Sequence, residues 1–148
     1  MMRVHGTTVA LDGAGVLVRG PSGSGKSDLA LRLIDAGARL VADDQTELWR
    51  RDETVMARSP ATIAGQMEVR GLGILRFPYV AEAPLRLVVD LVAPEAVERL
   101  PEPRVCEYLQ CPIPLLALAP FEASAAAKLR LAVAGLVKSL HTPIVVAP

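Results

Sequence analysis

Eight consecutive residues near the start of the chain have the types and spacing of a phosphate-binding loop. They read Gly-Pro-Ser-Gly-Ser-Gly-Lys-Ser and fit the Walker A or P-loop pattern G-x-x-x-x-G-K-[ST]. Glycines let the backbone curl until several N–H groups point at one anion, and a helix start adds partial positive charge. The predicted nucleotide-binding residues are Gly20, Pro21, Ser22, Gly23, Ser24, Gly25, Lys26 and Ser27. Lys26 can reach the β- and γ-phosphates of a nucleoside triphosphate, and Ser27 can place its hydroxyl on Mg²⁺.

The flanks of this loop supply the strand and the helix that such a loop needs. Residues 16–18 form a short apolar run before it, rich in β-branched side chains. After it, apolar residues recur at helical spacing from Leu29 to Ile34, and Gly37 stands where a left-handed helix end favours a residue without Cβ. A glycine- and serine-rich turn that matched the pattern by chance would not have these neighbours. We therefore expect binding of a triphosphate such as ATP.

Two adjacent carboxylates, Asp43 and Asp44, follow the apolar segment 40–42. Carboxylates at the end of a buried strand are costly unless something uses them, and ligands of α/β sheets bind at the carboxyl ends of strands. We expect this pair to meet the phosphates and Mg²⁺; the alternative is a solvated turn. Asp90, in the apolar run 85–91, is a rival metal partner. The pair is favoured because apolar residues follow Asp90 and place it within a strand.

A second polar pattern occurs in residues 67–74. Glu68 and Arg70 alternate with apolar residues, which predicts one strand with a charged face. Gly71 and Gly73 would permit a bulge or a close backbone approach. From the pattern alone, a half-exposed strand with a surface ion pair explains this segment equally well.

The remaining segments predict an α/β protein with a mixed sheet and flanking helices. Asp12-Gly13 is a two-residue hairpin turn between strands expected at 7–11 and 14–19, so an antiparallel hairpin leads into the loop. Further strands are expected at 40–42, 46–50, 54–58, 85–91, 105–109 and 115–119, with residues 111–114 as a proline-containing interruption. Helices are expected at 94–100 and 121–140, and the tail 144–146 is a candidate strand.

Composition limits the class of protein. The length of 148 residues fits a single domain, 1–148, and 51% hydrophobic against 3% aromatic residues predicts a core of Ala, Val and Leu. Lys and Arg total 16, as do Asp and Glu, so no basic face for nucleic acid is expected. Two cysteines at no zinc-binding spacing, and no signal or membrane-spanning segment, predict a cytoplasmic protein that does not bind membranes.

Absent motifs exclude several classes of nucleotide-binding protein. The chain contains no asparagine, which rules out the guanine-reading Asn-Lys-x-Asp motif and the asparagine of the protein-kinase catalytic loop. It contains no His-Arg-Asp or Asp-Phe-Gly triplet, and no Leu-Ser-Gly-Gly signature of transporter ATPases.

Taken in order, these motifs resemble one family. His5-Gly6, the hairpin, the loop, residues 40–44 and residues 67–73 are similar to the C-terminal catalytic domain of bacterial HPr kinase/phosphorylases, over roughly the first half of the chain. The resemblance implies a fold related to phosphoenolpyruvate carboxykinases, with ATP and Mg²⁺ as cofactors. It also implies phosphorylation of a serine on HPr, the carrier protein of the phosphotransferase system, and thereby regulation of that system and of carbon metabolism. It further implies a homo-oligomer, a hexamer in the family.

The resemblance also assigns roles to residues. It implies catalytic roles for His5, Lys26, Asp43 and Asp44, Mg²⁺ contacts for Ser27, Asp44 and Glu68, and a signature role for Arg70. One member of the acidic pair would be the base for the incoming serine and the other would help to position the metal; the sequence does not decide which. Without the resemblance, His5 reads as an ordinary surface histidine.

The sequence departs from the family in two ways. The family carries a separate N-terminal domain, and this chain resembles a short form that begins almost at the catalytic domain. The family also has a Pro-Gly-Arg-Asn segment linked to dephosphorylation, whereas residues 114–117 read Pro-Leu-Leu-Ala, so the phosphorylase reaction is not implied here. Two alternatives stay open: a P-loop kinase of another small substrate, which needs an acceptor pocket, and a nucleotide sensor that transfers nothing.

Overall fold

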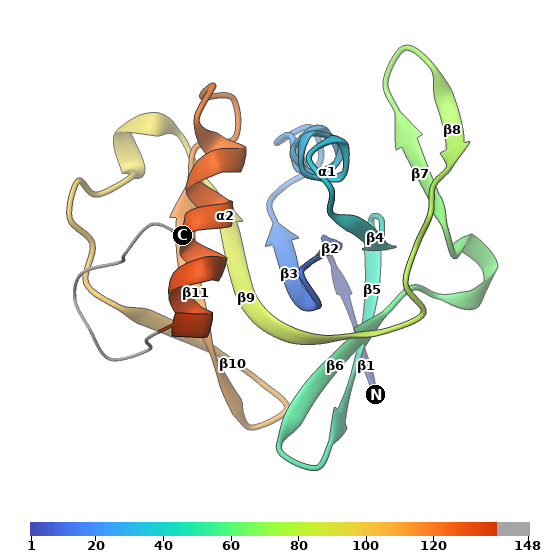
Figure 1. Ribbon diagram of the computed structural model, residues 1–148, viewed down its shortest axis with the longest axis horizontal. Helices are drawn as coiled ribbons and strands as arrows, with labels where there is room; N and C mark the ends of the chain where they lie inside the picture. Colours follow the sequence, from blue (N-terminus) through green and yellow to red (C-terminus); the bar gives the residue numbers. More distant parts are fainter. Residues whose placement is uncertain (139–148) are drawn as a thin grey trace.

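The computed structural model describes residues 1–138 (Figure 1), so the candidate strand 144–146 and the end of the expected helix 121–140 lie outside the described part. These residues form a nine-stranded sheet, a separate two-stranded hairpin and two α-helices. The strands are β1 Met2–His5, β2 Thr7–Leu11, β3 Ala14–Arg19, β4 Arg39–Ala42, β5 Gln45–Arg51, β6 Thr54–Arg58, β7 Gln66–Val69, β8 Gly73–Arg76, β9 Ala83–Leu91, β10 Arg104–Tyr108 and β11 Cys111–Leu118. The helices are α1 Lys26–Asp35 and α2 Ala125–Lys138, with 3₁₀ turns at Ala61–Ile63 and Pro94–Ala96.

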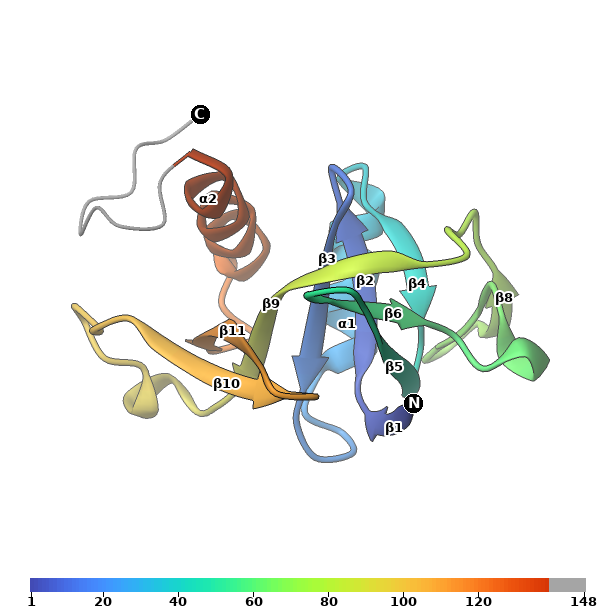
Figure 2. The same cartoon turned by 90° about the horizontal axis from the view of Figure 1, so that it is seen from below.

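The sheet is mixed, as the opening hairpin predicted. Its main path runs β1-β5-β6-β9-β3-β2-β4, and β11 joins β9 on one side and β10 on the other. The long strand β9 pairs with β6 at its start and with β3 and β11 further along (Figure 2). Both β3 and β4 are antiparallel to β2, so they run parallel to each other. Since β9 and β11 follow the same direction, the carboxyl ends of β3, β4, β9 and β11 lie at one edge.

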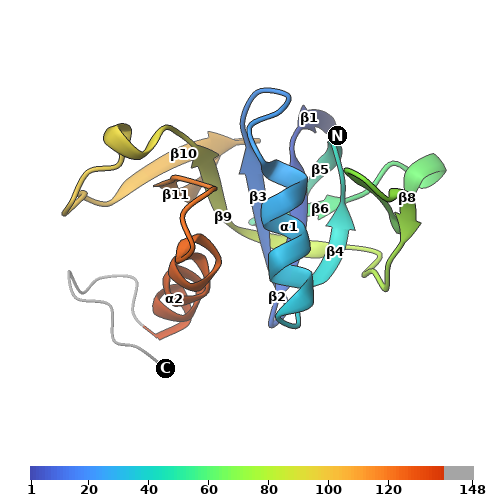
Figure 3. The ribbon, with the colours of Figure 1, turned by 90° about the horizontal axis from the view of Figure 1, so that it is seen from above.

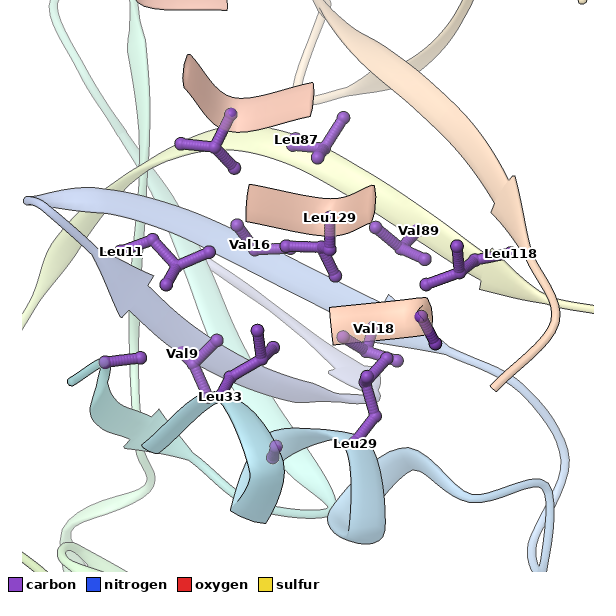
Figure 4. Packing of buried hydrophobic residues seen from close by; sticks show 14 of the residues in the cluster. Val9, Leu11, Val16, Val18, Leu29, Leu33, Leu87, Val89, Leu118 and Leu129 are labelled. Atoms are coloured by element: carbon purple, nitrogen blue, oxygen red, sulfur yellow. The ribbon is translucent and has the colours of Figure 1, made fainter. Parts of the chain in front are cut away.

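Strand β3 is buried on both faces, which explains its continuous apolar sequence. Val16 and Val18 face the two helices, and Leu17 packs into a second cluster on the opposite face. In Figure 4, Leu29 and Leu33 of α1 and Leu129 of α2 point at the same side of the sheet. Both helices therefore cover one face, and α1 begins at the sheet edge where the predicted loop lies (Figure 3). No helix within residues 1–138 combines the length and apolarity that a membrane crossing requires.

Two elements differ from the sequence expectation because their glycines and prolines turn the chain. Residues 67–74 are not one strand: β7 and β8 form a hairpin, with Gly71 and Gly73 at φ of 91° and 105° around its turn. The helix expected over 94–100 is a single 3₁₀ turn, Pro94–Ala96. The residues after it have no apolar face to bury, with Leu100 86% exposed, and helices this short depend on such packing.

The prolines of 111–114 lie inside β11 and do not interrupt it. Pro112 and Pro114 pair with β10 alone, and pairing with β9 begins at Leu115. A proline lacks the N–H that a second neighbouring strand would need, so it is tolerated where only one neighbour is present. The loop after this last strand is therefore 119–124, not 114–117, and it also contains no arginine.

Helix α2 begins at Ala125, four residues later than expected, because residues 120–124 form a turn that leads into it. The amide of Ala125 donates to Glu122 O at 3.1 Å, and the amide of Lys128 donates to Ser124 O at 2.8 Å.

The first strand, β1, had no sequence signal of its own, and an ion cluster holds it against β5. Arg3 Nη2 donates to Glu47 Oε2 at 2.7 Å, and Arg58 Nε donates to Glu47 Oε1 at 3.0 Å. The hydrogen bond from Arg3 and the one from Arg58 hold the pKa of Glu47 below its usual range. One carboxylate therefore links β1, β5 and β6, and it fixes the strand that ends at His5.

We expect Glu47→Gln to lower the free energy of unfolding by about 1 kcal/mol near neutral pH. Because the folded pKa is depressed, the carboxylate stabilises the fold above its unfolded pKa of about 4.3, and this stabilisation is lost as the pH falls through the lower folded pKa. Urea unfolding of both proteins across this range checks the prediction, with Glu53→Gln in the exposed β5–β6 turn as a control. A difference between the two proteins that stayed constant down to acid pH would contradict it.

Candidate active site

The predicted phosphate-binding loop connects β3 to α1 at the carboxyl edge of the sheet. Gly25, at φ 100°, precedes the helix, and its carbonyl accepts from the amide of Leu29 at 2.9 Å. A side chain at this position would be strained by the left-handed φ, and its Cβ would lie 2.9 Å from Cζ of Phe121, so glycine is favoured here. Gly23 has φ 81° and open space around it. The loop thus has the curled, side-chain-free backbone that a phosphate cradle requires.

Lys26 points back over this loop. Its Nζ donates to Gly20 O at 2.7 Å and to Pro21 O at 3.0 Å, and the residue is largely buried. An ammonium group has three protons, so one donor remains for an anion in the loop. The ammonium is therefore held where it can meet a phosphate.

Asp43 lies behind the loop and ties three elements together. Its Oδ1 accepts from Ser27 Oγ and from Thr7 Oγ1, both at 2.9 Å, and the amide of Glu68 faces its Oδ2 at 3.4 Å. The residue is only 9% exposed. These hydroxyl and carboxylate oxygens next to the loop are the ligand type that Mg²⁺ prefers.

Asp44 points the other way because the chain turns sharply at it. It has φ 68°, and the amide of Gln45 donates to Asp43 O at 2.7 Å, an i→i+2 bond of the rare γ-turn type. The amide of Gly6 holds this turn by donating to Asp44 O at 2.9 Å. Uncommon backbone conformations persist only where the surroundings enforce them, and they cluster at functional sites. Here the turn gives two neighbouring carboxylates opposite environments.

The Asp44 side chain is 67% exposed and lies beside His5 at the end of β1. Its Oδ1 is 3.2 Å from His5 Nε2, and which atom carries the proton depends on the histidine tautomer. The position of His5 near the acidic pair agrees with the resemblance. Its proximity to Asp44 could not be read from the residues alone.

A cavity of about 680 Å³ brings the predicted residues together. Its lining includes His5, Lys26, Ser27, Asp44, Glu68 and Arg70, while Asp43 stands behind Ser27. Glu68 comes from β7 and Arg70 from the turn that follows it. Gly23, Gly25 and Phe121 complete the wall on the loop side. Every residue that the sequence analysis proposed for the site therefore lies in the cavity wall or next to it, apart from loop residues that shape the cradle.

Asp90, the rival acid, is engaged by an arginine. Arg19 donates from Nε and Nη2 to its two oxygens at 2.7 and 2.8 Å, and a further donor reaches the hydroxyl of Tyr108 at 3.0 Å. The hydrogen bond with Asp90 raises the pKa of Arg19 further above its usual range. Within the described residues it is Asp43, and not Asp90, that contacts the loop serine.

Two further residues at the cavity, Thr7 and Phe121, have no sequence motif that would identify them. Thr7, which orients Asp43, was visible only as a hydroxyl residue at the start of an apolar strand. Phe121 was visible as one of the two phenylalanines of the chain, between Pro120 and Glu122. Neither position carries a motif, because their importance comes from strands and loops that meet only in the fold.

The site fits a nucleotide with Mg²⁺. The glycine cradle leaves room for phosphates, and Ser27 and Asp43 offer oxygen donors beside it. Within residues 1–138, no group of three or more His, Cys, Asp or Glu side chains is arranged to hold a metal ion. Kinase sites hold Mg²⁺ with one or two carboxylates together with substrate phosphates, and this donor set has that form.

Comparison with known proteins gives a consistent result. A family model described as the HPr serine kinase C-terminal domain matches residues 1–114. HPr kinase/phosphorylase of Clostridium acetobutylicum is 45% identical over 76 residues, which are 51% of this chain and 25% of that protein. The same-named protein of Listeria welshimeri is 49% identical over 76 residues, 51% of this chain and 24% of that protein. The chain thus matches about a quarter of the length of these relatives.

The fold agrees with these matches. The structure of the HPr(Ser) kinase/phosphatase from Coxiella burnetii superposes with a TM-score of 0.81 at 26% identity, over 90% of this chain and 94% of that one. The superposed 90% of the chain is more than the 114 residues that the family model matches. The α/β architecture with a mixed sheet, of the phosphoenolpyruvate carboxykinase-like P-loop type, is therefore confirmed. On the family match over residues 1–114 and this structural likeness, the chain belongs to the family of HPr serine kinase C-terminal domains.

Proposed function

We propose that this chain is an ATP-dependent kinase that phosphorylates a serine of HPr, with Mg²⁺ as the metal. The proposal rests on one observation: the exposed carboxylate of Asp44 and the ammonium group of Lys26 line the same cavity. A site that only sensed nucleotide would have no use for a carboxylate beside the terminal phosphate. Membership of the HPr kinase family makes HPr the acceptor to test first, with regulation of the phosphotransferase system and homo-oligomerisation as further parts of the proposal.

In this proposal, Asp44 and Asp43 have different roles. Asp44 is accessible and lines the cavity, so it is the base that accepts the proton of the incoming serine hydroxyl. His5 orients that carboxylate through its ring nitrogen. Asp43 is buried and accepts a hydrogen bond from Ser27, so we assign these two residues to Mg²⁺ binding. Glu68 lines the same cavity and is the third residue that we assign to the metal. When bound, Mg²⁺ would neutralise charge on the phosphates.

Phosphoryl transfer then follows from these positions. Asp44 takes the proton as the serine oxygen forms its bond to the γ-phosphorus, and the bond from that phosphorus to the bridging oxygen of ADP breaks. Lys26 and the loop amides stabilise the negative charge on the transferring group. A serine hydroxyl is a weak nucleophile, and a positioned base typically contributes about 10²–10⁴-fold to the rate. Arg70 lines the same cavity, and its role in the proposal is to contact the incoming acceptor. The proposal covers the kinase direction, because the loop 119–124 lacks the arginine that the family links to dephosphorylation.

Incubation with ATP, Mg²⁺ and purified HPr is expected to produce phosphoserine on HPr, detected by mass spectrometry. Lys26→Ala should abolish the product because the phosphates lose their one loop cation, whereas Lys128→Ala on the exposed face of α2 should not. HPr with its acceptor serine replaced by alanine serves as the second control. Nucleotide binding without transfer to HPr or to water would support the sensor, and transfer to a small molecule in place of HPr would support the other kinase class.

Asparagine substitutions separate the two aspartates. We expect Asp44→Asn to lower the rate of transfer by about 10²–10⁴-fold while ATP binding changes little, because only the base is lost. Asp43→Asn should also lose transfer, but with a raised Mg²⁺ requirement for nucleotide binding, because its oxygen beside Ser27 is replaced by an amide. Titrations of ATP and Mg²⁺ with single-turnover rates measure both, and Asp12→Asn in the β2–β3 turn is a matched control. Full activity of Asp44→Asn would remove it as the base.

A further inference from the structure

An exposed aromatic ring forms part of the cavity wall on the side away from the carboxylates. Phe121 lies in the loop 119–124 between β11 and α2, and 72% of the residue is exposed. It lines the same cavity as Lys26 and Ser27. Phe121 is one of the two phenylalanines of the chain, and its exposed ring stands at the wall of this cavity.

The backbone on both sides of the ring is held by hydrogen bonds. Arg32 of α1 donates to the carbonyls on both sides of it, Pro120 O and Glu122 O, the latter at 3.5 Å. Two atoms of the ring lie 2.9 and 3.0 Å from the point where a Cβ on Gly25 would be. The phenyl group is thus held against the last turn of the phosphate-binding loop, with its remaining surface open to the cavity.

The order of the strands in the sheet indicates which part of a bound nucleotide would contact the ring of Phe121. The acids of the site follow β4, on one side of β3, and Phe121 follows β11, on the other side. Figure 1 shows the same division, with α1 between the β7–β8 hairpin and the start of α2. Because the terminal phosphate must face the carboxylates for transfer, the rest of the nucleotide extends from the loop in the opposite direction. That direction leads to Phe121.

We propose that Phe121 is the platform on which the base of the bound nucleoside triphosphate stacks. The inference rests on the proposed function, because it takes the loop to hold a triphosphate. Every nucleobase has an aromatic face, and stacking on a side-chain ring is a common source of affinity in nucleotide recognition. The hydrogen bonds from Arg32 to the flanking carbonyls would then hold the backbone of this platform beside the phosphate-binding loop.

The test compares two ligands that differ in the base. Binding of Mg²⁺-ATP and of inorganic tripolyphosphate, which has the phosphates and no base, is measured by calorimetry for the unaltered chain, Phe121→Ala and Phe121→Trp. Phe121→Ala is expected to weaken ATP by about 5- to 100-fold and to leave tripolyphosphate within about twofold. Phe121→Trp should keep ATP affinity, and Leu100→Ala, which removes an exposed apolar side chain outside the cavity, should change neither ligand.

Each other result has a distinct meaning. Equal weakening of both ligands by Phe121→Ala would show that the ring only supports the loop at Gly25, and would overturn the inference. Unchanged affinity for ATP in Phe121→Ala would place the base elsewhere and overturn it as well, while leaving the kinase proposal intact. If the unaltered chain bound neither ATP nor tripolyphosphate, the proposed function would fail together with the inference.

Discussion

The carboxylate of Asp43 is the group on which the arrangement of the site depends. It accepts hydrogen bonds from a hydroxyl on α1 and a hydroxyl on β2, and it faces an amide of β7. A covered carboxylate is tolerated only where donors replace the water that it has lost. Helix α1, strand β2 and the β7–β8 hairpin therefore all contact the same carboxylate. Replacing that group would leave two hydroxyls without their acceptor and would loosen all three elements.

The turn at Asp44 places the identical carboxylates of two neighbouring residues in different environments. In a regular strand, successive side chains point to opposite faces of the sheet. Beyond the carboxyl end of a strand both faces are open to solvent, so successive side chains there would differ little in exposure. The γ-type turn makes the difference large: one carboxylate is enclosed by hydroxyls and the other stands in the cavity beside His5. This explains why the sequence alone did not distinguish the two members of the pair, since the difference between their environments depends on the positive φ of Asp44.

Local patterns predicted the part of the fold that they specify directly. The hairpin from 7 to 19, the loop and α1 were predicted from a two-residue turn, glycine spacing and apolar periodicity, and all three are present. The wrong predictions concern segments whose structure depends on tertiary contacts and not on local sequence. Prolines inside β11 are acceptable because one side has no partner there, and no α-helix forms over residues 94–100 because the residues after the 3₁₀ turn are mostly exposed. For the site, motifs located the loop and the acids, whereas Thr7 and Phe121 required knowledge of which strand ends meet.

The antiparallel strand β2 explains why the residues around His5 and Gly6 belong to the site. Because β2 lies between β3 and β4, the strand carrying the acids is two strand spacings from the loop strand, about 10 Å. The two strands therefore do not pair with each other. Asp43 is instead linked to β2 by the hydroxyl of Thr7 and to α1 by the hydroxyl of Ser27. The chain enters β2 through Gly6, where a Cβ would lie 2.7 Å from the side chain of Leu17 and 2.9 Å from Val18 O, so the approach requires glycine. The Gly6 amide also holds the turn at Asp44, and the preceding residue, His5, lies beside the carboxylate of Asp44. The positions of His5 and Gly6 thus follow from the antiparallel strand β2, which lies between the strand that leads into the loop and the strand that precedes Asp43 and Asp44.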